Sequence, residues 1–252
     1  MLGYLVQTTA KDGAGRADAL LVAVADRLAA AGVDLAGAVQ INTDRGENSP
    51  CDMDLRVLGD GPVLRISQNL GGGAEGCRLD TGALETAVGL VGARLDAGAE
   101  LVILNKFGKH EAAGRGFRTA IAQALEADVP VLLAVPASVM PAFQAFAGDL
   151  AVPLGSGEDA VFGWCVDQLT ARTVDARDLL CPLPVLRLRK RLEQLSPGER
   201  VRLEATDAAA VIDVPHFCAQ SGHVLLAEGE TGDGARYWIV ARGQMTPALA
   251  AG

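Results

Sequence analysis

The sequence predicts an α/β protein with two domains, a mostly parallel doubly wound sheet followed by a β-α-β-α-β-β two-layer sandwich. Its 252 residues exceed one typical domain and suit two, each large enough to bury a core. Half of the residues are hydrophobic but only 4% are aromatic, as in proteins whose small side chains pack between helices and a sheet. Short apolar runs alternate with helical patterns, which favours parallel strands covered by helices.

The first domain is expected over residues 1–170 and opens with a β-α-β pattern. Its expected elements are strands at 2–6, 35–42, 101–104 and 129–135, hairpin strands at 54–58 and 62–67, and helices at 17–31, 80–97, 117–127, after 138 and at 158–170. Asp80 is a good N-cap for the helix that follows it. The run Leu101–Leu104 is apolar throughout, which is typical of a strand buried on both faces.

The second domain is expected over residues 171–243, with a flexible tail at 244–252. Strands at 172–175 and 201–205 each precede a helix. The first helix follows Pro182, which suits a first helical turn because the missing N–H has no partner there. We expect Thr206 and Asp207 to cap the second helix and Gly222 to end it. A hairpin of residues 223–228 and 236–241 completes the sandwich.

Charge and hydropathy exclude several classes of partner. The net charge is −9, and the acidic excess lies mostly before Asp167, whereas nucleic-acid binding needs clustered Lys and Arg. No apolar run approaches the ~20 residues that span a bilayer, and the first residues carry no targeting pattern. We therefore expect a cytoplasmic protein without nucleic acid or membrane as a partner.

The five cysteines do not form a disulfide framework. They are odd in number and widely spaced, and no C-x-x-C pair is present for zinc or dithiol chemistry. A free cysteine is usually a small buried hydrophobe, and we interpret Cys218, on an apolar helix, in this way. Cys77 follows the glycine-rich stretch 71–76 and is a candidate second functional thiol, with a buried structural role as the alternative.

Cys181 differs from the others because it directly precedes Pro182 and the predicted helix. We expect it at the helix N-cap, where unpaired backbone N–H groups and the positive end of the helix dipole stabilise a thiolate. Its pKa should then be lowered and its sulfur should be nucleophilic at neutral pH. Cys181 is the candidate catalytic residue.

The exposed face of the same helix carries Arg187, Lys190 and Arg191. This basic patch lies on an otherwise nearly neutral domain and could dock a partner protein. The alternative is that it is simply a solvated helix face, which is common.

In the first domain, ligands are expected at the carboxyl ends of the parallel strands. Residues 10–17 align with the phosphate-loop pattern G-x-x-x-x-G-K-[ST], but Ala10, Arg16 and Ala17 replace the first Gly, the Lys and the hydroxyl. Asn105 stands where P-loop NTPases place a metal-holding Asp. The domain is therefore interpreted as degenerate P-loop-like, and ATP hydrolysis is not expected.

The loop 106–116 that follows Leu101–Leu104 is rich in glycine and in cations. Five basic residues are candidate anion ligands. Three lie in this loop, one just after it and one in the degenerate phosphate loop, namely Lys106, Lys109, Arg115, Arg118 and Arg16. Glycines free the backbone and a following helix start favours anions, so an oxyanion or phosphate site is one hypothesis. The other is that these side chains only solvate a surface loop.

Around residues 76–80 and 104–117 the first ~165 positions resemble an uncharacterised bacterial family of P-loop-like domains associated with molybdenum uptake and molybdoenzyme maturation. This resemblance implies no settled activity, and the cofactor or ligand of the domain stays open.

From about Val174 to Arg242 the chain resembles the TusA (SirA-like) sulfur-carrier family. The resemblance rests on Asp175-Ala176-Arg177 with Cys181-Pro182-Leu183-Pro184, and is supported by Pro197-Gly198-Glu199, Ala205-Thr206-Asp207 and residues 213–218. It implies that Cys181 carries sulfane sulfur as a persulfide without metal or organic cofactor. It also implies a donor, such as a cysteine desulfurase or a rhodanese, and an acceptor protein. A thiol redox sensor and an anion-gated regulator remain as alternatives.

Overall fold

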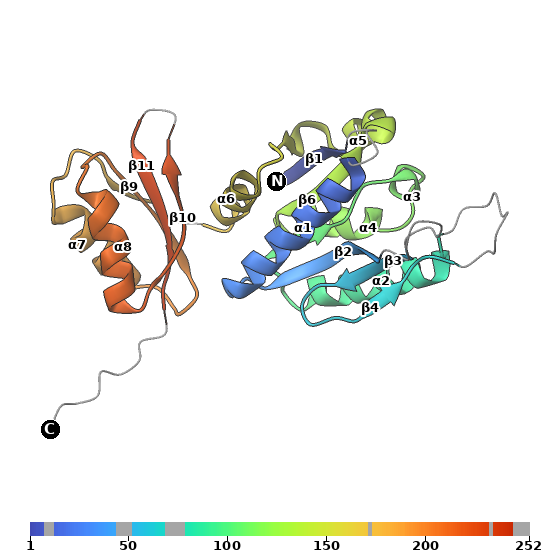
Figure 1. The fold of residues 1–252 in the computed structure, drawn as a ribbon, viewed down its shortest axis with the longest axis horizontal. Helices are drawn as coiled ribbons and strands as arrows, with labels where there is room; N and C mark the ends of the chain where they lie inside the picture. The colour runs from blue at the N-terminus through green and yellow to red at the C-terminus, as the bar shows by residue number, and fades with distance from the viewer. Residues whose placement is uncertain (8–12, 44–51, 69–78, 171–172, 232–233, 244–252) are drawn as a thin grey trace, which may run out of the picture. The chain divides into compact units, whose positions relative to one another are not determined.

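The structure, a computed structural model, describes residues 1–7, 13–43, 52–68, 79–170, 173–231 and 234–243. The expected tail at 244–252 and the glycine-rich stretch 71–76 lie outside these ranges. The chain forms two compact units, Met1–Phe162 and Gly163–Gly252, which are described separately (Figure 1). No helix within the described residues is long and apolar enough to cross a membrane.

The N-terminal unit alternates strands and helices along most of its length. Its elements are β1 (Leu2–Gln7), α1 (Gly13–Ala30), β2 (Leu35–Thr43), β3 (Asp52–Val57), β4 (Val63–Arg65), α2 (Thr81–Asp96), β5 (Leu101–Leu104), α3 (Lys109–Ala112), α4 (Arg118–Glu126), β6 (Val131–Pro136), η1 (Ala137–Val139), α5 (Met140–Ala147), η2 (Gly148–Leu150), β7 (Ala151–Pro153) and α6 (Glu158–Gln168).

These strands form one sheet, which in the described residues runs β4-β3-β2-β5-β6-β1-β7. The pairs from β2 through β5, β6 and β1 to β7 are parallel, whereas β3 pairs antiparallel with both β2 and β4. Buried side chains of α2, α4 and α5 share a core with one face of the sheet, while α1 packs on β1 and β2. β5 is buried along its whole length, as expected for a strand covered on both faces.

Most expected elements of this unit are confirmed to within a few residues, and Asp80 is confirmed as the N-cap of α2, where its side chain accepts the Ala83 N–H at 3.0 Å. Two elements of this unit were not predicted from the sequence. β7 is only three residues long and exists because it pairs with β1 at the sheet edge. The loop 106–116 contains the short helix α3. Because α3 is a single turn, it is too short to show the apolar periodicity that predicts a helix.

Gly37 sits in β2 where that strand passes closest to β5. Its φ is +129°, and a Cβ placed there would lie 1.8 Å from the carbonyl oxygen of Ile103, its partner in β5. Only glycine tolerates both the backbone conformation and this approach. The pairing of β2 with β5 therefore requires a residue without a side chain at position 37.

Replacing Gly37 should consequently weaken the N-terminal unit. We expect Gly37→Ala to lower the free energy of unfolding by about 2–3 kcal/mol, the usual cost of forcing extra atoms into a packed interior. Gly92→Ala is the control, because an added Cβ on this α2 glycine meets no atom within 4 Å and should stabilise the helix by about 0.5–1 kcal/mol. Denaturant unfolding measures both; equal effects would contradict the assignment.

The C-terminal unit contains the expected β-α-β-α-β-β order. Its elements are β8 (Thr173–Ala176), α7 (Leu183–Leu192), β9 (Arg200–Ala205), α8 (Ala210–Ser221), β10 (Val224–Glu230) and β11 (Arg236–Ala241). The sheet runs β10-β11-β9-β8, with β8 parallel to β9 and the other pairs antiparallel. Its core joins Leu188 and Leu192 of α7 to Val214 of α8 and to the buried Trp238 of β11. Gly222, with φ +69°, ends α8 as expected.

Candidate functional site

The loops that follow β8 and β9 leave the C-terminal sheet at the same edge. β8 and β9 are parallel and in register from Thr173 opposite Arg202 to Ala176 opposite Ala205. The carboxyl ends of the two strands are therefore neighbours, and ligand and catalytic groups of α/β sheets gather at such ends. The loop after β8 leads to Cys181, and the loop after β9 leads to α8.

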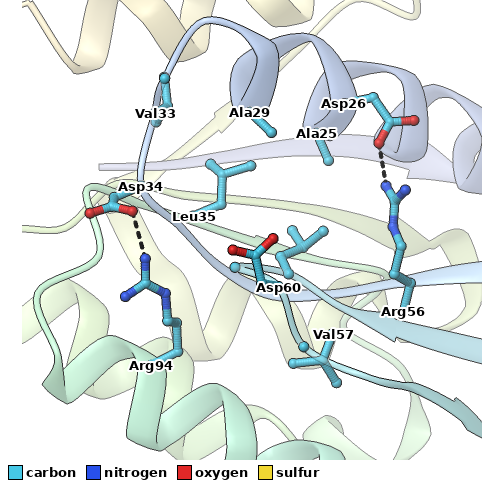
Figure 2. Close-up of a pocket in the computed structure, with 14 residues that line it drawn as sticks. Ala25, Asp26, Ala29, Val33, Asp34, Leu35, Arg56, Val57, Asp60 and Arg94 are labelled. Carbon is cyan, nitrogen blue, oxygen red and sulfur yellow. Dashed lines mark hydrogen bonds and ion pairs between the residues drawn. The ribbon is translucent and has the colours of Figure 1, made fainter. Parts of the chain in front are cut away.

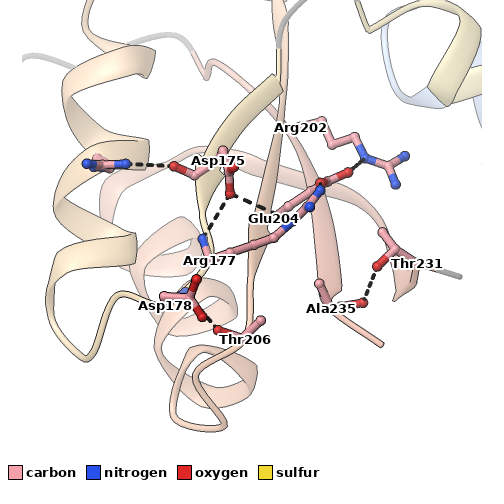
Figure 3. Close-up of polar contacts among 9 residues, drawn as sticks. Asp175, Arg177, Asp178, Arg202, Glu204, Thr206, Thr231 and Ala235 are labelled. Carbon is pink, nitrogen blue, oxygen red and sulfur yellow. Dashed lines mark hydrogen bonds and ion pairs between the residues drawn. The ribbon is translucent and has the colours of Figure 1, made fainter. Parts of the chain in front are cut away.

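Three contacts join these two loops, and we call them the loop clamp. The guanidinium of Arg177 pairs with the carboxylate of Glu204 at the end of β9. The backbone N–H of Asp178 donates to Thr206 Oγ1 at 2.9 Å, as Figure 3 shows. The backbone N–H of Cys181 donates to Asp207 Oδ2 at 2.5 Å. The path of the chain up to the thiol is thus fixed by Glu204 at the end of β9 and by Thr206 and Asp207 of the loop that follows.

Asp175 ties the helix to the same framework. Its side chain accepts the Arg177 N–H at 3.0 Å, and its carbonyl oxygen accepts a hydrogen bond from Arg187 at 2.7 Å. Arg187, expected as part of a docking surface, therefore links α7 to β8.

Glu204 is the buried charge of the loop clamp, with 8% of its surface exposed. Arg177 hydrogen-bonds one carboxylate oxygen and Arg202 donates to the other at 2.8 Å. These bonds, that of Arg177 foremost, hold the pKa of Glu204 below its usual range although burial acts in the opposite direction. The carboxylate stays ionised because both oxygens have cationic donors.

Cys181 is exposed at the start of α7. The expected N-cap position is wrong by one residue: Pro182 is the N-cap of α7, and Cys181 precedes it. The cap residue offers no side-chain hydrogen bond. Pro182 and Pro184 carry no N–H, and the Leu183 N–H donates to the Leu180 carbonyl oxygen at 2.9 Å, so the first turn of α7 offers the thiol few free amides. The thiol stands just outside that turn.

The expectation of a lowered Cys181 pKa is also wrong. A hydrogen bond to the side chain of Asp213 raises the pKa of the thiol, and the charges of Asp213 and Asp207 act in the same direction. The physical reason is proximity: two carboxylates disfavour a neighbouring thiolate, while the field of a helix dipole falls off within a turn. Asp207 of the second loop and Asp213 of α8 therefore favour the thiol over the thiolate.

Asp207 has a double role that differs from the expected helix cap. The N-cap of α8 is Ala209, and Asp207 Oδ1 accepts the Ala209 N–H at 3.2 Å while Oδ2 accepts the Cys181 N–H. One carboxylate thus fixes both the start of α8 and the backbone at the cysteine.

Large apolar side chains are exposed around the thiol. Leu180 is 73% exposed, Leu183 47%, Leu186 49% and Ile212 75%. Leu180 and Leu183 flank Cys181 in the chain, Leu186 lies one turn further along α7, and Ile212 precedes Asp213 on α8. We call these four side chains the apolar rim. Clustered exposed apolar residues of this kind mark interaction surfaces.

The pKa assignment predicts a specific gain of reactivity. Asp213→Asn removes the carboxylate that raises the Cys181 pKa most, so this pKa should fall and more thiolate should be present at neutral pH. We expect faster alkylation of Cys181 by iodoacetamide at pH 7.5, followed by peptide mass spectrometry. Asp178→Asn is the control. Asp178 lies in the loop that carries Cys181 but does not contribute to the raised pKa of the thiol, so this change should leave the alkylation rate unchanged. An unchanged rate in Asp213→Asn would contradict the assignment.

The other cysteines differ in environment. Cys165 and Cys218 are buried and free, and burial raises the pKa of Cys165 to about 12 and that of Cys218 to about 11. The core interpretation of Cys218 is confirmed by its 2% exposure.

Cys77 and Cys51 lie outside the described residues. Within the described ranges no group of three His, Cys, Asp or Glu side chains could hold a metal ion.

The remaining predicted docking residues lie on α7. Lys190 is exposed, and Arg191 hydrogen-bonds Gln194 at 2.8 Å. Arg187 is bound to β8, and Lys190 is the member of the trio whose side chain makes no hydrogen bond or ion pair within the described residues.

The predicted anion ligands of the N-terminal unit do not converge on one point. Lys106 and Lys109 both line a cavity of about 270 Å³. Arg118 instead donates to the Glu111 carbonyl at 3.2 Å and lies over the Phe146 ring at 4.3 Å. Arg115 and Arg16 are exposed and do not line this cavity.

A second cavity, of about 500 Å³, lies at the amino end of β2 (Figure 2). Its arginines already have partners: Arg56 pairs with Asp26 and Arg94 with Asp34, each at 2.6 Å. Because these cations are neutralised and the carboxyl ends of the strands lie elsewhere, this cavity is the weaker candidate for an anion site.

Comparison with known families follows the division of the fold. The family described as "Protein of unknown function (DUF2478)" matches residues 6–164, and the family "Sulfurtransferase TusA" matches residues 172–240. The chain belongs to both families, one in each part. The TusA match includes the loop clamp, Cys181 and α8, so the site described above is that of the TusA region.

Individual relatives agree with this division. A putative sulfur carrier protein of Neisseria meningitidis is 44% identical over 62 residues, which are 25% of this chain and 84% of that protein. The sulfur carrier protein TusA of Pseudomonas entomophila is 38% identical over 73 residues, 29% of this chain and 91% of that protein. The molybdenum import ATP-binding protein ModC 2 of Bradyrhizobium diazoefficiens is 36% identical over 150 residues, 60% of this chain but only 17% of that relative's length.

Sequence reasoning found Cys181 and missed the carboxylates that surround it. Asp207 was expected only as a cap of the second helix, and Asp213 was noted only as part of the family resemblance, without a role. The parallel order of β8 and β9 was the available signal, because it brings whatever follows both strands to one edge. The clamp between Arg177 and Glu204 joins positions 27 residues apart, and no local pattern indicates it.

Proposed function

We propose that this protein is a sulfur-relay protein that carries sulfane sulfur as a persulfide on Cys181. The TusA family membership of the C-terminal region supports a sulfur-relay role. The observation that carries the finer proposal is the exposed Cys181 thiol, held by the loop clamp at the start of α7 inside the region shared with sulfur carriers. No metal or organic cofactor is part of the proposed reaction.

The transfer step needs no oxidant. The Cys181 thiolate attacks the outer sulfur of a persulfide on the donor protein, and a new S–S bond forms on Cys181. The S–S bond of the donor breaks, and its electron pair leaves with the donor's cysteine as a thiolate. An acceptor nucleophile then takes the outer sulfur in the same way and regenerates the Cys181 thiolate.

Asp213 gives this step a proton acceptor. The thiol hydrogen-bonds the Asp213 side chain, so its proton can pass to that carboxylate when Cys181 attacks. Asp207 keeps the backbone of Cys181 in place through the 2.5 Å hydrogen bond, and the positive end of the α7 dipole favours the anionic sulfur that remains.

Donor and acceptor are proposed to dock in turn on the apolar rim, with Lys190 at its far end on α7. A cysteine desulfurase or a rhodanese is the proposed class of donor, and the proposed compartment is the cytoplasm. Molybdoenzyme or molybdenum cofactor maturation is the proposed destination, supported by the similarity to ModC 2. The N-terminal unit is proposed to act as a regulatory module that binds an oxyanion or nucleotide.

A thiol redox sensor has less support. Such a sensor needs a low-pKa thiol and a resolving cysteine within reach. Here the pKa of Cys181 is raised, and Cys218 is buried.

Mass spectrometry tests the proposed chemistry directly. The full chain is incubated with a cysteine desulfurase and cysteine, digested and compared with Cys181→Ser. We expect one added sulfur atom on the peptide that contains Cys181 in the wild type and none at that position in the variant. Cys218→Ser should load like the wild type. Sulfur on other cysteines but not on Cys181 would refute the proposal.

The apolar rim predicts a loss of docking without a loss of thiol reactivity. Leu183→Glu and Leu186→Glu place charges in an interface core, where one such change typically weakens binding about tenfold or more. Sulfur loading from the desulfurase should slow accordingly, while alkylation by iodoacetamide should stay within about twofold of the wild type.

Val224→Glu is the matched control, because Val224 on β10 is 50% exposed, like Leu183 and Leu186. It should leave loading unchanged. Equal slowing in all three variants would mean that charge on the unit, and not the apolar rim, governs the encounter.

A further inference from the structure

The cavity of about 270 Å³ in the N-terminal unit lies where an α/β sheet binds ligands. Gln40 of β2 and Asn105, directly after β5, line it, so it opens at the carboxyl ends of two adjacent parallel strands. Its volume is slightly below the range of about 300–1,000 Å³ that is typical of sites for drug-sized ligands. The cavity is therefore suited to a small molecule.

One side of the cavity is apolar. The side chains that form it come from β3, from the segment after β4, from α2 and from the start of α4, namely Met53, Leu55, Ile66, Leu79, Leu84 and Phe117. Leu55, Ile66, Leu84 and Phe117 belong to the main core of the unit. This wall is held by the fold and offers an apolar ligand body a dry surface.

The floor carries a fixed amide pair. Asn105 Nδ2 donates to Gln40 Oε1 at 3.0 Å, and Asn105 Oδ1 accepts the Gln40 N–H at 3.3 Å. Both residues are buried, at 4% and 7% exposure. Asn105, which stands where P-loop NTPases place a metal-holding Asp, is thus a neutral amide that is hydrogen-bonded to Gln40.

The other side of the cavity is cationic. Lys106 and Lys109 line it and make no ion pair within the described part of the chain, and Glu111 is the one acidic residue among the described lining residues. With His110 neutral, two lysines and one glutamate give a formal charge of +1. The chain as a whole carries −9, so this wall differs in sign from the rest of the protein.

Glu111 also makes the cationic wall rigid. Its two carboxylate oxygens accept the Gly108 N–H at 2.8 Å and the Phe117 N–H at 3.1 Å. Gly116 permits this arrangement, because its φ is +59° and a Cβ there would lie 2.4 Å from Glu111 Oε1. The loop that presents Lys106 and Lys109 is therefore closed around a buried carboxylate and is preorganised.

We propose that this cavity binds a small organic monoanion, a carboxylate with a compact apolar body. The apolar body lies against the wall formed by β3 and α2, and the carboxylate lies at Lys106 and Lys109. This inference rests on the proposed role of the N-terminal unit as an anion-binding module and narrows its ligand. An inorganic oxyanion would leave the apolar wall uncovered, and a neutral molecule would leave the lysines unused.

Benzoate is a suitable probe, with benzyl alcohol as its neutral counterpart and inorganic phosphate and molybdate as anions without an apolar body. Binding to the full chain is measured by saturation-transfer NMR and by calorimetry. We expect benzoate to bind at least about tenfold more tightly than benzyl alcohol, since the carboxylate adds charge-assisted contacts. Phosphate and molybdate should not displace it at equal concentration.

The double variant Lys106→Ala/Lys109→Ala should weaken benzoate binding about tenfold. Both side chains are exposed, so the fold should be retained. Arg115→Ala removes an exposed cation of the same loop that does not line the cavity, and it should bind benzoate like the wild type. Equal loss in Arg115→Ala, no benzoate binding by the wild type, or displacement by phosphate, molybdate or a nucleotide would overturn the proposal.

These outcomes are separate from the sulfur relay. Benzoate binding to the full chain reports on the cavity of the N-terminal unit and should be the same in Cys181→Ser, whereas the relay is measured as added mass on Cys181. Failure of either experiment therefore leaves the other interpretable.

Discussion

The site of the C-terminal unit depends on the parallel pairing of β8 with β9. Because the two strands end side by side, residues of the second loop meet residues of the first, and the loop clamp joins them at Glu204, Thr206 and Asp207. Its first contact contains a buried ionised carboxylate, which is costly to leave without its partner. Loss of strand pairing would therefore release the segment that carries Cys181 together with the start of α8.

Two electrostatic influences act on Cys181 in opposite directions. The positive end of the α7 dipole favours a thiolate, and Asp213 with Asp207 favour the thiol. The net effect raises the pKa of Cys181, so the thiol is favoured over the more reactive thiolate. Under the proposed function, docking on the apolar rim would remove water and bring the donor's own charges to the site. Reactivity would then be set by the complex more than by the isolated carrier.

Local patterns in the sequence were sufficient for most helices and strands and for the choice of Cys181. Asp80 was identifiable as a cap because capping acts over three residues. The charge environment of Cys181 was not, because Asp207 and Asp213 reach it through the packing of α8. The same limit explains Arg187, whose contact with Asp175 depends on how α7 meets β8, and Arg118, which the sequence places among anion ligands and the fold places on Phe146.

The contrast among the cysteines of the described residues has a practical side. Cys165 and Cys218 are buried with strongly raised pKa values, whereas Cys181 is exposed. Thiol-directed reagents at neutral pH will thus discriminate among these three by accessibility alone. A fluorophore or spin label introduced this way would report from the edge where β8 and β9 end, and it could follow partner encounters in real time.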